Sequence, residues 1–419
     1  MSTGDDLLRS IAANADDDAL RLVYADWLEE QGDLARARYV RVEVAVAQQG
    51  GPDHCPSSLW RESTSLWQQH ARQWKAELPA WARDEPEWDR GVIRRVNVTA
   101  RNLLRHGNRL GQYLPGVRTV GITRDEDQWP ALVARPALSR LRGVHAEGAE
   151  AWRHLSGMTL PLLEELHWNF LLGTPTHLQW GAEQAERWPR LHSLWLRHGI
   201  FPLPNLALMP RLRSLRLAWY GMEPTTGGEL PPNLENLELI TPQESTPEVL
   251  KSTNCARLRR LRLNQSIWNP TDLTLLNRNW PELKMLQISN SGISVNDLLP
   301  LFEADRFPGL RELNLHCLPC TEADFIELVD TPAFGRLRRL SIIFVSDVEA
   351  GLQRWLSSSR CEHLESLNFS FSQPCETLAR AMCESPYLGR LHRLRILASP
   401  LYTFPVRVSG SYDKGEVRS

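Results

Sequence analysis

A few side chains of this 419-residue chain stand at spacings that could do chemistry. Cys317 and Cys320 form a lone Cys-x-x-Cys motif, and His145 and Glu147 form a lone His-x-Glu motif. Such residues can hold zinc, but the zinc sites that combine both motifs have a proline directly before the first cysteine, which this chain lacks. The repeat pattern described below turns Cys317 towards solvent and Cys320 into the core, so we interpret both cysteines as packing residues.

Four carboxylates, at Asp26, Glu29, Glu30 and Asp33, could also bind a metal or act in catalysis. Asp26, Glu29 and Glu30 lie on the solvent-facing side of a predicted helix, opposite its apolar stripe, where charged residues are normal. Asp33 is placed to cap the next helix. The chain has no glycine-rich phosphate loop, no Gly-x-Ser-x-Gly motif and no His-Glu-x-x-His motif. The sequence therefore predicts no enzyme, no cofactor and no metal, and an enzyme with its site in the repeat loops stays as an alternative.

The composition is ordinary for a soluble globular protein, with 42% hydrophobic residues and a formal net charge of −2. This balance gives no bulk electrostatic reason to bind nucleic acid or an anionic membrane. There is no apolar run of about 18 residues, and the first residues lack the basic and apolar regions of a secretory signal. Seven scattered cysteines do not resemble a disulfide framework. We therefore expect a cytoplasmic protein with no membrane partner.

Residues 1–80 are predicted to form a small α-helical module. The first helix begins near Thr3, and the third begins after Asp33. A fourth is expected over 58–78, where three tryptophans stand seven residues apart. The second helix has an apolar stripe at helical spacing, formed by Leu20, Val23, Tyr24, Trp27 and Leu28.

Residues 17–33 carry a resemblance to a known family. They read Asp-Asp-Ala-Leu-Arg-Leu-Val-Tyr-Ala-Asp-Trp-Leu-Glu-Glu-Gln-Gly-Asp, and Arg-Ala-Arg-Tyr-Val-Arg follows at 36–41. This segment resembles the bacterial repeat-companion domain, a short helical segment at the N-terminus of proteins built from tandem repeats, including leucine-rich repeats. The match covers about the first 45 residues. The resemblance implies an architecture and a bacterial source, and it assigns no activity.

From Arg90 onward, one apolar pattern recurs thirteen times. Each unit has an apolar residue, two variable residues, an apolar residue, one variable residue and a third apolar residue. Successive units begin 21 to 28 residues apart, and the last four intervals are 27 residues each. Such periods with Leu-x-x-Leu-x-Leu are the signature of leucine-rich repeats. The pattern predicts an α/β solenoid, a leucine-rich-repeat horseshoe with a parallel concave sheet, preceded by the helical module.

The segments that return over the outer face differ along the chain. Later ones are predicted to be helical, at 297–302, 322–328 and 376–382, and earlier ones, at 201–204 and 223–228, to be irregular or 3₁₀. The later repeats resemble the ribonuclease-inhibitor type. We expect three parts: a helical repeat-companion or cap module at 1–80, a solenoid of about 13 repeats at 81–400, and a C-terminal cap strand with a disordered tail at 401–419.

The strand pattern also nominates a binding surface. The residue between the second and third apolar positions must face the concave side, because alternate strand residues point to opposite faces. Around repeats four to eight, these positions and their neighbours bring tryptophan beside arginine, a composition enriched at interface hot spots. The alternative is that these side chains only stack along the strand ladder. The predicted partner-binding residues are His167, Phe170, Trp195, Arg197, His198, Arg216, Trp219, Glu238 and Arg262.

The mixed charge of this face favours a protein partner. Arginines such as Arg259 and Arg262 could follow a phosphate backbone, but glutamates such as Glu165 and Glu238 share the same face. We therefore expect a non-catalytic interaction module or scaffold that binds a partner protein through its concave face. A nucleic-acid-binding repeat protein is the alternative. The pattern leaves open the oligomeric state, and whether the helical module is only a cap or a second binding site.

Overall fold

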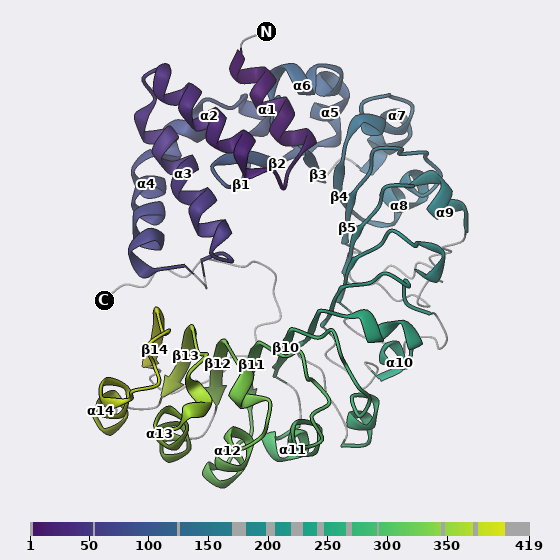
Figure 1. Cartoon of the computed structure of the whole chain (residues 1–419). Coiled ribbons are helices and arrows are strands. Elements are labelled where there is room, and N and C mark those ends of the chain that lie inside the picture. Colours follow the sequence, from purple (N-terminus) through teal and green to yellow (C-terminus); the bar gives the residue numbers. More distant parts are fainter. Residues whose placement is uncertain are drawn as a thin grey trace.

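The protein forms a curved array of repeats that starts at a helical module (Figure 1). The computed structural model describes residues 3–52, 55–123, 126–169, 182–197, 206–218, 229–240, 247–264, 270–290, 293–344, 348–371 and 376–398. The predicted tail at 401–419 and the return segments at 201–204 and 223–228 lie outside these residues. No helix in the described ranges is long and apolar enough to cross a membrane.

Four helices form the N-terminal module, as the sequence predicts. They are α1 (Thr3–Ala13), α2 (Asp18–Glu30), α3 (Leu34–Gln48) and α4 (Ser57–Ala76). Asp17 caps α2 by accepting a hydrogen bond from the backbone N–H of Ala19 at 2.9 Å. Asp33 caps α3 in the same way, 3.1 Å from the N–H of Arg36. Each cap satisfies a backbone donor that the helix itself leaves unpaired.

The predicted apolar stripe of α2 is wrong at one position. The side chain of Val23 is 50% exposed, and that of Arg21 is buried. The guanidinium of Arg21 lies 2.9 Å from the carboxylate of Asp89, in the segment that joins the module to the repeats. Because a buried charge is tolerated when it is paired, Arg21 can lie on the buried side of α2 while Val23 faces outward.

One sheet of fourteen strands runs through the described chain in strict sequence order. The first pair is antiparallel, and every later pair is parallel, as expected when each repeat adds one strand. The described parallel pairs keep their register except between His316 and Leu318, where β11 pairs with β12. The strands are β1 (Glu87–Asp89), β2 (Val92–Thr99), β3 (Thr119–Thr123), β4 (Gly143–Glu147), β5 (Glu165–Asn169), β6 (Ser193–Arg197), β7 (Ser214–Ala218), β8 (Asn236–Ile240), β9 (Arg260–Asn264), β10 (Met285–Ser289), β11 (Glu312–Leu318), β12 (Arg339–Phe344), β13 (Ser366–Phe371) and β14 (Arg393–Ala398). The fold is an α/β solenoid, a leucine-rich-repeat horseshoe.

The second and third apolar positions of the repeats point into one continuous core, as predicted. From Val96 on β2 to Phe369 on β13, every one of them is buried. On β14, by contrast, the side chain of Leu394 is 43% exposed. β14 is the last described strand, so no described repeat follows to pack against Leu394. The residues predicted to cover it lie outside the described ranges.

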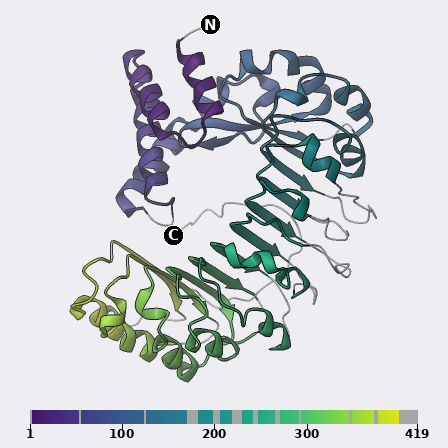
Figure 2. The ribbon, with the colours of Figure 1, turned by 45° about the vertical axis from the view of Figure 1, so that its right-hand side comes forward.

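Short helices and 3₁₀ turns form the outer layer (Figure 2). The helices are α5 (Ala100–His106), α6 (Leu110–Tyr113), α7 (Trp129–Val133), α8 (Ala149–Leu155), α9 (Ala182–Arg187), α10 (Pro247–Leu250), α11 (Val295–Glu303), α12 (Glu322–Val329), α13 (Glu349–Leu356) and α14 (Glu376–Glu384). The 3₁₀ turns are η1 (Ala80–Ala82), η2 (Gly107–Arg109), η3 (Glu126–Gln128), η4 (Leu138–Arg140), η5 (Leu206–Leu208), η6 (Thr253–Arg257), η7 (Pro270–Leu275), η8 (Phe334–Arg336) and η9 (Ser359–Cys361). The three predicted return helices are confirmed as α11, α12 and α14.

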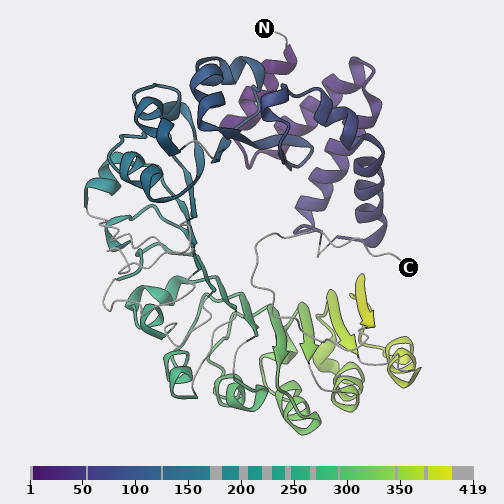
Figure 3. The ribbon, with the colours of Figure 1, turned by 180° about the vertical axis from the view of Figure 1, so that it is seen from behind.

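The two ends of the array meet. Arg393 on β14 donates hydrogen bonds to the carbonyl oxygens of Pro52 and Cys55, between α3 and α4, and the second bond is 3.4 Å long. Figures 1 and 3 show the α3–α4 end of the module beside the last strands. One side chain of the last described strand therefore reaches the N-terminal module.

Candidate partner-binding surface

The concave face carries a continuous row of side chains at the position predicted to face outward. We call this the central row, formed by His145, His167, Trp195, Arg216, Glu238 and Arg262, which pair in register on β4 to β9. Five of the predicted partner-binding residues lie in it. Arg197 lies in the next row of the same face, and Phe170, His198 and Trp219 lie outside the described residues.

Trp195 is held between two neighbours. The ring of His167 stacks on it with centroids 3.5 Å apart and an angle of 11° between the planes. On its other strand neighbour, the guanidinium carbon of Arg216 lies 4.1 Å from the centre of the indole ring. Stacking and cation–π contacts of this kind fix a side chain in place. The stacking along the strand ladder that the sequence offers as the alternative is therefore present at Trp195, and it holds these side chains in place.

Glu238 fixes the other half of the row. Its carboxylate lies 3.2 Å from the guanidinium of Arg216 and 3.7 Å from that of Arg262. The amide of Asn264 donates a hydrogen bond to it at 3.3 Å. The Arg262 side chain keeps 45% of its surface exposed, so it remains available to a partner. The row thus presents alternating charge on a rigid support.

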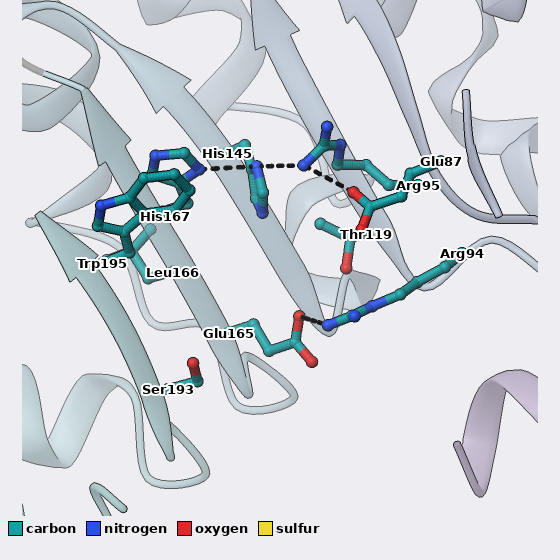
Figure 4. A pocket seen from close by; sticks show the side chains of 10 residues that line it. All are labelled: Glu87, Arg94, Arg95, Thr119, His145, Glu165, Leu166, His167, Ser193 and Trp195. Atoms are coloured by element: carbon teal, nitrogen blue, oxygen red, sulfur yellow. Dashed lines mark hydrogen bonds and ion pairs between the residues drawn. The ribbon is translucent and has the colours of Figure 1, made fainter. Parts of the chain in front are cut away.

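The two histidines of the row are buried and neutral. His145 Nδ1 lies 3.0 Å from Arg95 Nη1 and 3.0 Å from His167 Nδ1 (Figure 4). An arginine can only donate, so His145 Nδ1 accepts and its proton sits on Nε2. Burial, with the arginine charge nearby, lowers the pKa of His145 to about 3. Burial, with His145 and then Arg95, lowers the pKa of His167 to about 2.

A small cavity of about 210 Å³ opens beside these histidines, between β2 and β6. We call it the β2–β6 pocket. It is lined by Glu87, Arg94, Arg95, Thr119, His145, Glu165, Leu166, His167, Ser193 and Trp195 (Figure 4). Arg94 binds Glu165 across it at 2.6 Å, and Arg95 binds Glu87 at 2.9 Å.

The sequence reasoning missed Arg95, Thr119 and Ser193 as site residues. Each directly precedes the second core position of its repeat, so strand alternation places it on the concave face as surely as the central row. The sequence reasoning followed the residue between the second and third core positions and the residue after the third, but not the residue before the second. Including that position would have added Arg95, Thr119 and Ser193 to the predicted concave face.

The other chemical candidates have structural explanations. Cys320 is buried and Cys317 is half-buried, the arrangement that the repeat pattern predicts, and burial raises the pKa of both thiols, that of Cys320 to about 12. Asp26 and Glu29 both accept hydrogen bonds from Arg41. Within the described ranges, no group of three or more histidine, cysteine, aspartate or glutamate residues could hold a metal ion.

Several solved structures are similar to this chain. The structure titled as a TLR13–ssRNA13 complex is 16% identical, with a TM-score of 0.41, and the similarity covers 73% of this chain and 43% of that one. The leucine-rich-repeat domain of APL1B is 14% identical, with a TM-score of 0.31 and coverage of 77% and 89%. The LRIM1/APL1C complex is 13% identical, with a TM-score of 0.27 and coverage of 68% and 53%. No protein-family model and no curated protein matches the chain. The fold of this chain is established by its own strand order, with fourteen strands in sequence order in the described residues.

Proposed function

We propose that this chain is a non-catalytic scaffold that binds a partner protein through the central row of its concave face. The observation that carries the proposal is the position of Trp195, sandwiched between His167 and Arg216. Tryptophan and arginine contribute most of the affinity in many protein interfaces. Because contacts within the chain already order these side chains, binding costs little side-chain entropy.

The charge pattern supports a protein as the partner. Glu238 lies between Arg216 and Arg262, so the row presents an anion flanked by two cations. A nucleic acid would meet this carboxylate with its own negative charge, whereas a protein can offer charges of both signs. Nucleic-acid binding is the alternative function, and the same experiment separates the two.

We further propose that residues 1–80 act as the N-terminal cap of the solenoid. Leu78 and Ala82 belong to the same core as the first repeats, while α1 to α3 have a core of their own that includes Val92. The short strand β1 pairs antiparallel with β2 and so covers the first edge of the parallel sheet. A covered edge and a covered core end are what a solenoid terminus needs. The resemblance of this module to the repeat-companion domain agrees with such a role.

The test is capture of binding proteins from a lysate of the source cells, followed by affinity measurement with the purified partner. The native chain is compared with the Trp195→Ala/Arg216→Ala variant. A matched control is Trp60→Ala/Arg61→Ala, because Trp60 is an exposed tryptophan on α4, away from the concave face. We expect the first variant to lose at least tenfold in affinity and the control to bind as the native chain does.

Three outcomes would contradict the proposal. Equal binding by both variants would move the site off the central row. Loss in the control alone would move it to the helical module. Capture that nuclease abolishes, with a steep dependence on salt, would favour nucleic acid.

A further inference from the structure

One edge of the sheet is strongly basic. In each of the thirteen repeats, the residues directly before and after the first apolar position lie where the chain enters its strand, and we call these residues the rim. Of the twenty-six rim residues, fourteen are arginine or lysine and four are glutamate, on a chain whose formal net charge is −2. The repeats therefore gather cations along this edge. The first apolar positions that define the rim are Ile93, Val117, Leu141, Leu163, Leu191, Leu212, Leu234, Leu258, Leu283, Leu310, Leu337, Leu364 and Leu391.

The backbone holds the rim in a regular row. From Glu164 to His392, the residue after each first apolar position donates a backbone hydrogen bond to the carbonyl oxygen of the same position in the preceding repeat. The bond from Arg213 to His192, for example, is 2.9 Å long. Neighbouring strands lie about 4.8 Å apart, so the rim presents side chains at steps of about this length.

A groove of about 1070 Å³ follows the rim from β5 to β10. Five arginines and four carboxylates are among the residues that line it. Three of these arginines, Arg190, Arg211 and Arg257, are exposed, and none of the three has a carboxylate partner within the described part of the chain. They come from three different repeats, so they are spread along the groove.

The carboxylates of the groove are already matched by arginines. Glu235 lies 3.6 Å from Arg213 and 3.8 Å from Arg259, and Arg259 also lies 3.7 Å from Glu282. Two glutamates and two arginines therefore form a neutral group.

The other two carboxylates also lie beside arginine. Glu164 binds both Arg118 and Arg142, and only 13% of its side chain is exposed. Asp16, in the helical module, lies 4.0 Å from Arg90. The charges that the groove leaves without a partner are therefore positive, and an anionic group is needed to pair with them.

Two features favour a polypeptide over a nucleic acid as the source of these anions. A nucleic acid carries a phosphate on every nucleotide, whereas a polypeptide can place neutral or basic residues against the glutamates of the rim. No rim residue is a tryptophan, tyrosine or phenylalanine on which a base could stack. Trp195 on β6 cannot serve instead, because His167 and Arg216 cover both faces of its ring.

We propose that the rim groove binds an acidic, extended segment of the partner protein, with Arg190, Arg211 and Arg257 pairing with its Asp or Glu side chains. The proposal rests on the proposed function of the concave face. From β5 to β10 there are five strand spacings of about 4.8 Å, or about 24 Å, which is the length of roughly seven extended residues. The central row lies on the same strands, so one partner can contact both surfaces.

The test uses a labelled peptide of about eight residues in which glutamate alternates with serine, and a counterpart in which glutamine replaces glutamate. Binding to the full-length chain is followed by fluorescence anisotropy at constant ionic strength. The rim variant is Arg190→Gln/Arg211→Gln/Arg257→Gln. We expect saturable binding of the glutamate peptide and none of the glutamine peptide. The rim variant should bind about tenfold more weakly, because each exposed ion pair contributes roughly a factor of two.

A matched control removes three exposed arginines from the outer layer, as Arg105→Gln/Arg109→Gln/Arg135→Gln, and should bind the peptide as the native chain does. Replacing the three rim arginines by lysine keeps the charge and should retain the binding, which separates charge from a defect in folding. Equal losses in the rim variant and the control, or no binding of the glutamate peptide, would overturn the proposal. Tighter binding of a single-stranded oligonucleotide with the same number of charges, lost in the rim variant, would also overturn it and assign the groove to nucleic acid.

The captured partner separates this proposal from the proposed function. We expect the rim variant to bind that partner about tenfold more weakly than the native chain does. Unchanged binding by the rim variant would overturn the acidic-segment proposal. The proposed function would still stand in that case if Trp195→Ala/Arg216→Ala loses the partner.

Discussion

Acidification is expected to loosen the sheet at β4 and β5, because His145 and His167 are held there in their neutral forms. In the unfolded chain both imidazoles take up protons near pH 6.5. In the folded chain they stay neutral down to about pH 3 and about pH 2. Between these limits the unfolded state binds more protons than the folded state, so stability falls as the pH falls below about 6.5.

The size of the effect follows from the same values. Between pH 7 and pH 5, each neutral histidine is expected to reduce the free energy of unfolding by about 2 kcal/mol. The two together contribute roughly 4 kcal/mol, which is a large fraction of the stability of a typical domain. The loss should continue to grow until the pH approaches about 3, where His145 begins to protonate in the folded state.

The measurement is amide hydrogen exchange of β4 and β5 at pH 7 and pH 5, corrected for intrinsic rates and converted to opening free energies. Other groups also titrate, so the comparison is with His145→Asn/His167→Asn, in which this part of the pH dependence should vanish. His363→Asn serves as the control, because the His363 side chain is 44% exposed. The reasoning is refuted if the double variant keeps the native pH dependence, or if NMR titration gives either histidine a pKa near 6.5.

Three further predictions concern single substitutions. Leu261→Ala in the buried core should lower the free energy of unfolding, measured with urea, by about 2–5 kcal/mol. Arg262→Ala, at the next and exposed position, should lower it by less than about 1 kcal/mol. Similar losses in the two variants would contradict the assignment of Leu261 to the core and Arg262 to the concave surface of β9. Gly91→Ala should lower the free energy of unfolding by roughly 3 kcal/mol or more, because φ is +81° and the new Cβ would lie 2.7 Å from the backbone of α3. Gly32→Ala has a similar φ of +83°, but no atom lies within contact distance of its Cβ, so in the same assay the loss should be about 1 kcal/mol. Arg216→Met should weaken the binding of the captured partner about tenfold, as measured by calorimetric titration, and should change the free energy of unfolding by less than about 1 kcal/mol. Unchanged affinity would show that the contact between Trp195 and Arg216 is not part of the binding surface.

Much of the fold could be predicted from the sequence because its rules are local. Strand alternation with a period near 25 residues placed the core residues of β2 to β13, and the predicted cap at Asp33 marked the start of α3. The failure at Val23 has a different origin. The buried Arg21 depends on Asp89, 68 residues away, and helical periodicity contains no information about such a partner.

The candidate surface was predicted in part for the same reason. Strand register follows from the repeats, so the order from His167 to Arg262 could be predicted. The β2–β6 pocket could not, because it depends on how Arg95 reaches past Gly121 to His145 and on which ring nitrogen faces it. Whether these residues bind a partner stays a prediction.

The pairing of β1 with β2 has a consequence for assembly. β1 pairs with β2 and so covers the first edge of the sheet. At the other end, β14 pairs only with β13 in the described part of the chain, and Arg393 on β14 contacts the helical module. A chain shortened to begin after residue 90 would lack β1 and would leave the edge strand β2 unpaired. An unpaired edge strand is a template for pairing with another chain, so the shortened chain should associate more readily than the full-length chain. The N-terminal module thus keeps this edge of the sheet from acting as such a template.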